Sequence, residues 1–246
     1  MKRSVTAAAG PQFHVSRRPA SGSSAGSATR VDRETRERLI AAAERLFADR
    51  GFRKVTVREI CREARANVAA VNYHFGDKLG LYREVLQAAI DVMRATTEAA
   101  RAAGAGRSAD ERLRRYITTY VCRLLASGDH AWLHRLITRE MNDPTPALDA
   151  LVEQGVRPRI EYLSGLVAEI LNAAPSDQCV LRCVASIQAQ SIAYLPNPIA
   201  SRLGLAFKPS RANVEAVARH IADFSIAGVH ALRRTTRESP AGAAPP

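Results

Sequence analysis

The chain has 246 residues and a net charge of +12, and 46% of its residues are hydrophobic whereas only 5% are aromatic. This length fits one domain or two, and the apolar content is sufficient for a buried core. Abundant alanine with sparse glycine favours helices, and the low aromatic content argues against an aromatic-rich β-sandwich. No apolar run approaches the roughly 18 residues of a membrane-spanning helix and no secretory signal precedes residue 30, so we expect a cytoplasmic protein with no membrane partner.

The positive charge is concentrated towards the N-terminus. Residues 1–30 carry a net charge of +5 and residues 31–80 carry +3, whereas residues 81–232 carry only +2 and residues 233–246 carry +2. This distribution is typical of a DNA-binding end joined to a nearly neutral partner domain. RNA or an anionic membrane would attract the same surface, so charge alone does not choose among these partners.

The N-terminal third begins with a segment that lacks helical periodicity. Residues 1–30 are rich in Ala, Ser, Gly and Pro, and we expect them to form a disordered basic tail. From Asp32 to Arg50, apolar residues recur at helical spacing and Gly51 provides a stop, which predicts the first helix. Arg53 and Lys54 follow it, where they are either phosphate contacts or solvated side chains.

Two short helices joined by a tight turn are predicted between residues 55 and 78. Thr56 and Glu59 have the spacing of a capping box, which satisfies the unpaired N–H groups at the start of a helix. Asn67 is a suitable N-cap for the second helix. The residues between them have an apolar face and a polar face, as a helix packed on one side requires.

The second short helix has the features of an element that enters the major groove of DNA. It is expected to bury Val68 and Val71 and to leave an outward face of small and polar residues: Ala69, Ala70, Asn72, Tyr73 and His74. Asparagine can bond bidentately to adenine, and alanine can contact the thymine methyl group. Tyr73, His74 and Lys78 are donors suited to phosphate oxygens. An ordinary helical hairpin with a solvated face is the alternative.

Three segments, LFADRGF (Leu46–Phe52), VTVREI (Val55–Ile60) and NYHFGDK (Asn72–Lys78), occur here in order before a long fourth helix. At these spacings, the region from Asp32 to about Leu86 resembles the DNA-binding domain of the TetR family of bacterial transcriptional repressors. Two positions depart from that family's pattern. Arg65 stands where the turn usually has glycine, and Asn72 stands where a phosphate-contacting tyrosine is frequent.

We therefore assign residues 31–80 to a helix-turn-helix domain that binds double-stranded DNA. The side chains expected at the DNA are Arg53, Lys54, Thr56, Asn67, Ala69, Ala70, Asn72, Tyr73, His74 and Lys78.

The rest of the chain is predicted to be helical throughout, so the fold class is all-α. A long fourth helix over residues 78–102 leaves the DNA-binding domain and enters the second domain, which makes it the natural lever between them. Further helices are expected over residues 110–126, 129–141, 147–173, 176–195 and 211–233, and Pro158 should kink the third of these or split it in two. The total is about nine helices, with residues 81–233 forming a ligand-binding and dimerisation domain and residues 234–246 a disordered tail.

The resemblance also implies roles for the C-terminal helices. In TetR-like proteins helices five to seven usually enclose a small-molecule pocket, and the last two helices usually pair with a second subunit. Residues 135–151 further resemble a TetR subgroup with a characteristic C-terminal domain. We therefore expect a homodimer through helices eight and nine (residues 176–195 and 211–233), whose continuous apolar faces support it, and two recognition helices that read a palindrome.

An unidentified small-molecule effector is expected among the apolar helix faces of the second domain. A drug-sized ligand is held by mostly apolar walls with a few polar groups. The residues that we expect to line this pocket are Tyr116, Tyr120, Trp132, Leu136, Ile137, Arg139, Tyr162, Gln188 and Gln190. For any one of them, an ordinary role in the core is the alternative.

An enzyme is the main competing interpretation. His130 and His134 lie four residues apart on a predicted helix, near Asp129 and Glu140, which is compatible with a metal site. However, the sequence has none of the metalloprotease, nucleophile-elbow, phosphate-loop or dinucleotide motifs. A solvated pair explains the histidines better, so we expect no enzymatic activity, no metal and no cofactor.

Two further alternatives concern regulation. Cys179 and Cys183 are four residues apart and would permit a redox switch, although packing is favoured because buried cysteine behaves as a small hydrophobe. An architectural DNA-binding protein would show weak sequence preference, whereas a regulator should favour its operator over bulk DNA by about 10³. The interpretation that we carry forward is a sequence-specific repressor that its effector releases from DNA.

Overall fold

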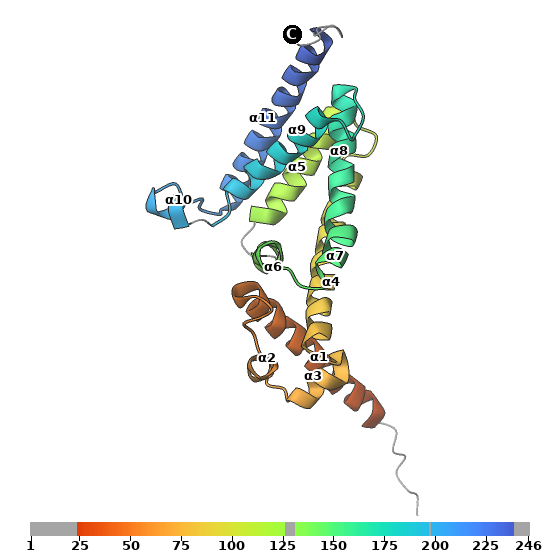
Figure 1. Cartoon of the computed structure of the whole chain (residues 1–246), viewed down its shortest axis with the longest axis vertical. Helices are drawn as coiled ribbons and strands as arrows, with labels where there is room; N and C mark the ends of the chain where they lie inside the picture. The colour runs from red at the N-terminus through yellow and green to blue at the C-terminus, as the bar shows by residue number, and fades with distance from the viewer. Residues whose placement is uncertain (1–23, 126–130, 197, 239–246) are drawn as a thin grey trace, which may run out of the picture.

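The computed structural model describes residues 24–125, 131–196 and 198–238, and in these ranges every regular element is a helix (Figure 1). The all-α fold is therefore confirmed. The N-terminal elements are α1 (Ser24–Arg50), α2 (Val57–Ala64), α3 (Val68–Phe75) and α4 (Lys78–Ala103). The later elements are α5 (Ala109–Leu125), α6 (Ala131–Asn142), α7 (Leu148–Leu151), the π-helical turn η1 (Val152–Val156), α8 (Arg157–Leu171), α9 (Gln178–Ala193), α10 (Pro198–Arg202) and α11 (Arg211–Glu238).

The first helix begins at Ser24, so the expectation that a disordered tail reaches residue 30 is wrong for residues 24–30. The segment contains no proline, and ion pairs between Arg30 and Glu34 and between Arg33 and Glu37 support the following turns. At the other end, α11 continues to Glu238, beyond the expected limit of 233. The rest of the two expected tails, residues 1–23 and 239–246, lies outside the described residues.

One apolar core holds α1 to α4 together. Phe47 of α1 and Tyr82 of α4 are almost fully buried, and their rings meet edge to face with centroids 4.9 Å apart. The same cluster includes Leu136 of α6 and Leu151 of α7. The helix-turn-helix region is therefore packed directly against two elements of the C-terminal half.

A second core is formed by α5, α8, α9 and α11, with buried residues such as Leu113, Leu163, Val184 and Ile221. In Figure 1, α4 runs from the α1–α3 group to this second group, and α10 projects from its side. Helix α4 contributes to both cores, with Leu81 and Met93 in the first and Ala100 in the second.

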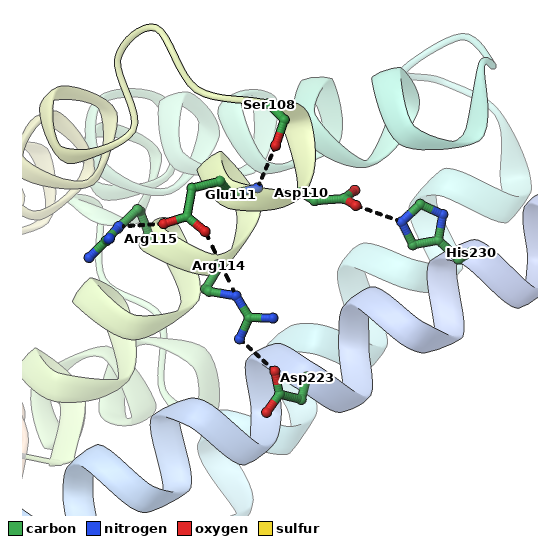
Figure 2. Close-up of polar contacts among 7 residues, drawn as sticks. All are labelled: Ser108, Asp110, Glu111, Arg114, Arg115, Asp223 and His230. Carbon is green, nitrogen blue, oxygen red and sulfur yellow. Dashed lines mark hydrogen bonds and ion pairs between the residues drawn. The ribbon is translucent and has the colours of Figure 1, made fainter.

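Polar contacts fix α11 against α5 (Figure 2). Arg114 of α5 pairs with Asp223 of α11, and Asp110 Oδ2 lies 2.8 Å from His230 Nε2. Asp223 and His230 are seven residues apart, which places them on the same face of α11. Their partners hold this face against α5, while α11 also packs on α8 and α9 and leaves side chains such as Phe224 exposed.

The helix expected over residues 147–173 is three consecutive elements, α7, η1 and α8. Pro158 lies in the first turn of α8, and the irregular turn precedes it because proline lacks the N–H that a continuous helix needs. Gly155 in this turn faces α4, where an added Cβ would lie 3.1 Å from Met93 Sδ. The expected interruption at Pro158 is confirmed as a division into separate elements, and the irregular turn lies against α4.

Candidate nucleic-acid interface and ligand cavity

The start of α2 has the expected capping box. The backbone N–H of Thr56 donates to Glu59 Oε2 at 2.8 Å, and the backbone N–H of Glu59 donates to Thr56 Oγ1 at 3.3 Å. Arg50 of α1 adds a contact of 2.8 Å to the same carboxylate. The hydrogen bonds from Thr56, followed by that from Arg50, lower the pKa of Glu59 to about 2. This network fixes the angle at which α2 leaves α1.

The turn between α2 and α3 carries a non-glycine residue in the left-handed conformation. Arg65 has φ 51° and ψ 47°, and the N–H of Ala66 donates to Cys61 O at 2.9 Å to close the helix. Asn67 then caps α3 by accepting from the Ala70 N–H at 2.8 Å. The glycine that the TetR pattern places at position 65 would adopt this conformation without the steric cost that a side chain adds.

The outer face of α3 is made of Val68, Ala69, Asn72 and Tyr73, all of which are exposed. Tyr73 is 77% exposed, which agrees with its expected outward position, whereas Val68 is 42% exposed and was wrongly expected to be buried. Val71 is fully buried and Ala70 is half-buried against the same core. The outward face therefore includes Val68, and Ala70 contributes to it only in part.

His74 does not face outward, which corrects our expectation. Its side chain is only 7% exposed, and Nε2 lies 3.3 Å from Asp32 Oδ1 on α1. The spacing carried a signal for this position, because His74 follows Val71 by three residues and Ala70 by four. His74 therefore holds α3 against α1, and we no longer assign it to DNA contact.

The basic residues near this surface differ in their surroundings. Lys54 is exposed, whereas Arg53 Nε lies 2.8 Å from Asp143 Oδ1 in the loop after α6. Lys78 Nζ lies 4.3 Å from the centre of the Phe52 ring, and burial lowers the pKa of this lysine. Arg53 and Lys78 thus already have partners within the protein.

A cavity of about 100 Å³ lies between α4, α5, α6 and α8. Of the expected ligand-binding residues, Tyr120 and Ile137 line it. The described lining is mainly apolar and consists of Val92, Met93, Thr96, Tyr120, Arg123, Leu124, Leu133, His134, Ile137 and Arg159. Burial lowers the pKa of His134, so this side chain is neutral at physiological pH.

The other expected ligand-binding residues are not brought together. Tyr116 and Tyr162 lie behind Tyr120 in a chain of ring contacts with centroids 6.0 and 5.9 Å apart. Trp132 and Leu136 pack in the N-terminal core, Arg139 contacts α1, and Gln188 lies on α9 away from the cavity lining. Gln190 borders a separate, larger hollow of about 530 Å³ between α9, the segment around α10, and α11.

Sequence reasoning missed the arginines Arg123 and Arg159 and the α4 contribution to the cavity. The α4 residues looked like ordinary core positions, and an arginine on a helix usually faces solvent. Only the juxtaposition of α5 with α8 brings these two guanidinium groups to the same cavity.

Helix α6 lines the cavity on one side and holds the N-terminal region on the other. Arg135 Nε lies 3.0 Å from Asp49 Oδ1, and Arg139 donates to Asp49 O at 2.7 Å. Glu140 is 1% exposed, accepts a hydrogen bond from the Tyr82 hydroxyl of α4, and accepts another from the Thr145 N–H at 3.2 Å. We call this set of contacts the α6 clamp.

The alternative sites suggested by the sequence are not supported. Within the described ranges, no group of three His, Cys, Asp or Glu residues is placed to hold a metal ion, and His130 lies outside those ranges. The four cysteines are unlinked, and burial raises the pKa of Cys183 to about 11, which disfavours the reactive thiolate. Among the described residues, no helix has the length and hydropathy needed to cross a membrane.

Two family descriptions match consecutive parts of the chain. Residues 39–85 match bacterial regulatory proteins of the tetR family, and residues 109–229 match the C-terminal domain of the HTH-type transcriptional dual regulator CecR. The chain is 33% identical to CecR from Shigella flexneri over 143 residues, which are 55% of this chain and 64% of that regulator. The aligned part thus spans less than two thirds of that relative.

Shorter matches include both a transcriptional repressor and a transcriptional activator. The chain is 38% identical to the HTH-type transcriptional repressor BepR from Brucella suis over 53 residues, which are 22% of this chain and 25% of BepR. It is 37% identical to the HTH-type transcriptional activator FasR from Mycolicibacterium smegmatis over 75 residues, which are 30% of this chain and 34% of FasR.

Solved structures share the fold at low sequence identity. A regulatory protein of the tetR family from Rhodococcus RHA1 aligns with a TM-score of 0.60 and 21% identity, covering 79% of this chain and 96% of that one. SCO4454 from Streptomyces coelicolor, a TetR-family regulator, aligns with a TM-score of 0.59 and 22% identity, covering 80% and 97%. The capped helix-turn-helix, the all-helical architecture and these matches lead to one conclusion: the chain belongs to the TetR family of DNA-binding transcriptional regulators.

Proposed function

We propose that this regulator is a homodimeric repressor that binds a palindromic operator and releases it when a small-molecule effector fills the α4–α5–α6–α8 cavity. Residues 31–80 bind DNA, and residues 81–233 bind the effector and dimerise. The protein acts in the cytoplasm, where bacterial DNA is accessible. The observation that carries the proposal is the position of α6, which lines the cavity through Leu133 and Ile137 and forms the α6 clamp through Arg139 and Glu140.

DNA recognition is assigned to the exposed part of α3. Asn72 reads a base edge, Ala69 allows close approach of the backbone, and Tyr73 donates to a phosphate oxygen. Lys54 adds a phosphate contact before α2. One helix of this length reads few base pairs, so two copies related by twofold symmetry are needed to specify an operator.

Dimerisation is supported by the uncovered faces of α9 and α11. Leu181 and Ile192 of α9 are 40% and 48% exposed, and Phe224 of α11 is 64% exposed. After α10, Leu203 and Leu205 are 66% and 73% exposed, and Leu205 lines the hollow between α9 and α11. Exposed apolar side chains on these last helices are consistent with a surface that another protein covers. Because the opposite face of α11 is bound to α5, a second copy would dock here.

In the proposed mechanism, a ligand between α4, α5, α6 and α8 displaces α6. The α6 clamp transmits this displacement to Asp49 on α1 and Tyr82 on α4, and the separation of the two α3 helices changes. They then no longer match successive major grooves. The effector must bind the form that is incompetent for DNA more tightly than the competent form, because otherwise no equilibrium shifts.

The test is DNA binding to the regulator's own upstream region, measured by fluorescence anisotropy with excess competitor DNA at several salt concentrations. Asn72→Ala and Tyr73→Ala should weaken binding at least about tenfold, while Arg157→Gln, an exposed change on α8, should leave it unchanged. Binding that disappears with modest salt or competitor, with no effect of the α3 variants, would instead favour an architectural DNA-binding protein. A reporter gene measures whether the protein represses transcription, since its relatives include both a repressor and an activator.

A further inference from the structure

We infer that the effector is an organic anion with an apolar body, and that Arg123 and Arg159 hold its carboxylate. This inference rests on the proposed function, because it names the class of ligand for the cavity between α4, α5, α6 and α8. Both guanidinium groups line that cavity, one from α5 and one from α8, and both side chains are half-buried.

Neither arginine has a carboxylate partner in the described part of the chain. Other arginines on the same two helices do: Arg112 pairs with Glu169, Arg114 with Asp223, and Arg157 with Glu153. Arg123 has a weaker contact, in which Nη1 donates to Thr96 Oγ1 at 3.2 Å. That hydroxyl in turn donates to Val92 O at 2.7 Å, so it supplies a single acceptor to the guanidinium. Most of the five donors of Arg123 thus remain available to a ligand.

Arg159 has fewer hydrogen-bond partners than Arg123. Its Nε atom is buried and has no hydrogen-bond partner, and its guanidinium lies over the Tyr120 ring at 5.0 Å from the centroid. Nearby, the hydroxyl of Tyr116 is also buried without a hydrogen-bond partner. Buried donors in this condition are rare because they lose hydration without compensation. A carboxylate in the cavity would compensate the Arg159 charge and matches the planar fork of a guanidinium.

The remaining groups of the cavity select against other ligand classes. None of the described lining residues is acidic, so the cavity has no group that would neutralise a cationic ligand. His134 is neutral, because burial lowers its pKa. An uncharged ligand would leave the Arg159 donor without an ionised acceptor. The apolar side chains Met93, Leu124 and Leu133 suit a hydrocarbon body.

Isothermal titration calorimetry on the full chain, without DNA, tests the ligand class directly. The probes are alkanoates from butanoate to decanoate and arylalkanoates from benzoate to 4-phenylbutanoate, each compared with the amide and the amine of the same skeleton. We expect at least one carboxylate to bind at least about tenfold more tightly than its amide and its amine, because charge-assisted hydrogen bonds to a guanidinium are about twice as strong as neutral ones. If no carboxylate binds, or if amides or amines bind as tightly, the inference is overturned.

Substitution of the two arginines tests whether they bind the carboxylate of the ligand. Arg159→Gln and Arg123→Gln should each reduce carboxylate affinity about tenfold and change amide affinity little, whereas Arg159→Lys should retain part of the preference. Arg157→Gln is the matched control, since it lies on the same helix, is 55% exposed and pairs with Glu153 outside the cavity lining. Equal carboxylate binding by the parent and both Gln variants would contradict the assignment. Circular dichroism checks the fold of each variant. If a variant does not fold, the comparison of carboxylate with amide binding on the parent protein still tests the ligand class.

The calorimetry and the DNA-binding assay separate this inference from the proposed function. A carboxylate that binds the parent with the expected selectivity but does not release the operator supports the anion site at Arg123 and Arg159 and contradicts control of DNA binding through this cavity. Release of the operator by an amine alone, with no carboxylate binding, supports effector control and overturns the inference.

Discussion

Tyr82 of α4 donates its hydroxyl proton to the buried carboxylate of Glu140 on α6. Burial and this hydrogen bond raise the pKa of Tyr82 well above its usual range, so the hydroxyl remains a donor at any physiological pH. The contact joins the helix that leaves the DNA-binding region to the helix that lines the ligand cavity. Both partners of this contact are almost fully buried.

Tyr82→Phe should therefore destabilise the fold and weaken the coupling between the two halves. Removing the hydroxyl leaves a buried carboxylate with one donor fewer, which costs about 1–3 kcal/mol of unfolding free energy. Chemical denaturation measures this cost, and effector-dependent DNA release measures the coupling. Tyr73→Phe, which removes an exposed hydroxyl, is the control for stability. Equal stability of the parent and Tyr82→Phe would mean that solvent reaches Glu140.

The capping box predicts an acid-dependent contribution from α2. The pKa of Glu59 is about 2 in the folded protein against an ordinary value of 4.5, so its ionised form favours folding. This contribution is complete above pH 4.5 and is lost as the pH falls towards 2. Glu59→Gln should lower the melting temperature at pH 7, and the difference from the parent should shrink between pH 5 and pH 3. A difference that is constant across this range would show that the charge of Glu59 is not responsible.

Local signals in the sequence were sufficient for most helix positions and for the DNA-binding motif, but not for the start of α1 or the end of α11. Thr56, Glu59 and Asn67 act through neighbours within three residues, so their roles can be inferred without the fold. Helical spacing from Val71 gave a signal for the inward position of His74, but the exposure of Val68 could not be inferred from an eight-residue helix, because the packing against α1 decides which face is buried.

The ligand cavity was less predictable because its parts are distant in the chain. Tyr120 and Ile137 were found from the apolar faces of single helices. Arg123 and Arg159 line the same cavity only because α5 packs against α8, and the periodicity of apolar residues in the sequence does not predict that contact. Similarly, the burial of Glu140 depends on Tyr82, which precedes it by 58 residues.

Arg65→Gly should stabilise the protein. Arg65 is held at φ 51°, where a side chain costs about 1–2 kcal/mol relative to glycine, and part of this gain is offset by the greater freedom of glycine in the unfolded chain. A net gain of about 1 kcal/mol is expected in urea unfolding. Asn172→Gly at the end of α8, where φ is 56°, is the matched control and should gain less, because asparagine tolerates this conformation better. A loss of stability in Arg65→Gly would indicate that the arginine side chain makes a compensating contact.

Gly80→Ala should disrupt the junction between α3 and α4. A Cβ at this position would lie 1.9 Å from the backbone oxygen of Phe75, so the end of α3 must move. We expect a loss of about 1–3 kcal/mol in stability and weaker operator binding, since overpacking against backbone is not relieved by a rotamer change. Gly165→Ala within α8 is the control, because nothing lies within 4 Å of its added Cβ and helix propensity favours alanine. If both variants gain stability, the junction tolerates the added methyl group.

Phe224→Glu should separate the proposed dimer. Phe224 is 64% exposed on the side of α11 that faces away from α5, next to the groove that α9 forms with α11. A carboxylate buried at a subunit interface without a partner is strongly unfavourable, so the dimer dissociation constant should rise at least about 100-fold. Light scattering after size exclusion, over a range of protein concentrations, measures this change. Val31→Glu on α1 introduces the same charge at a 60% exposed position and should leave the dimer intact. Because a palindromic operator requires two recognition helices, Phe224→Glu should also bind the operator more weakly while it keeps its helical content. If the Phe224→Glu variant remains dimeric, the subunit interface lies on another face.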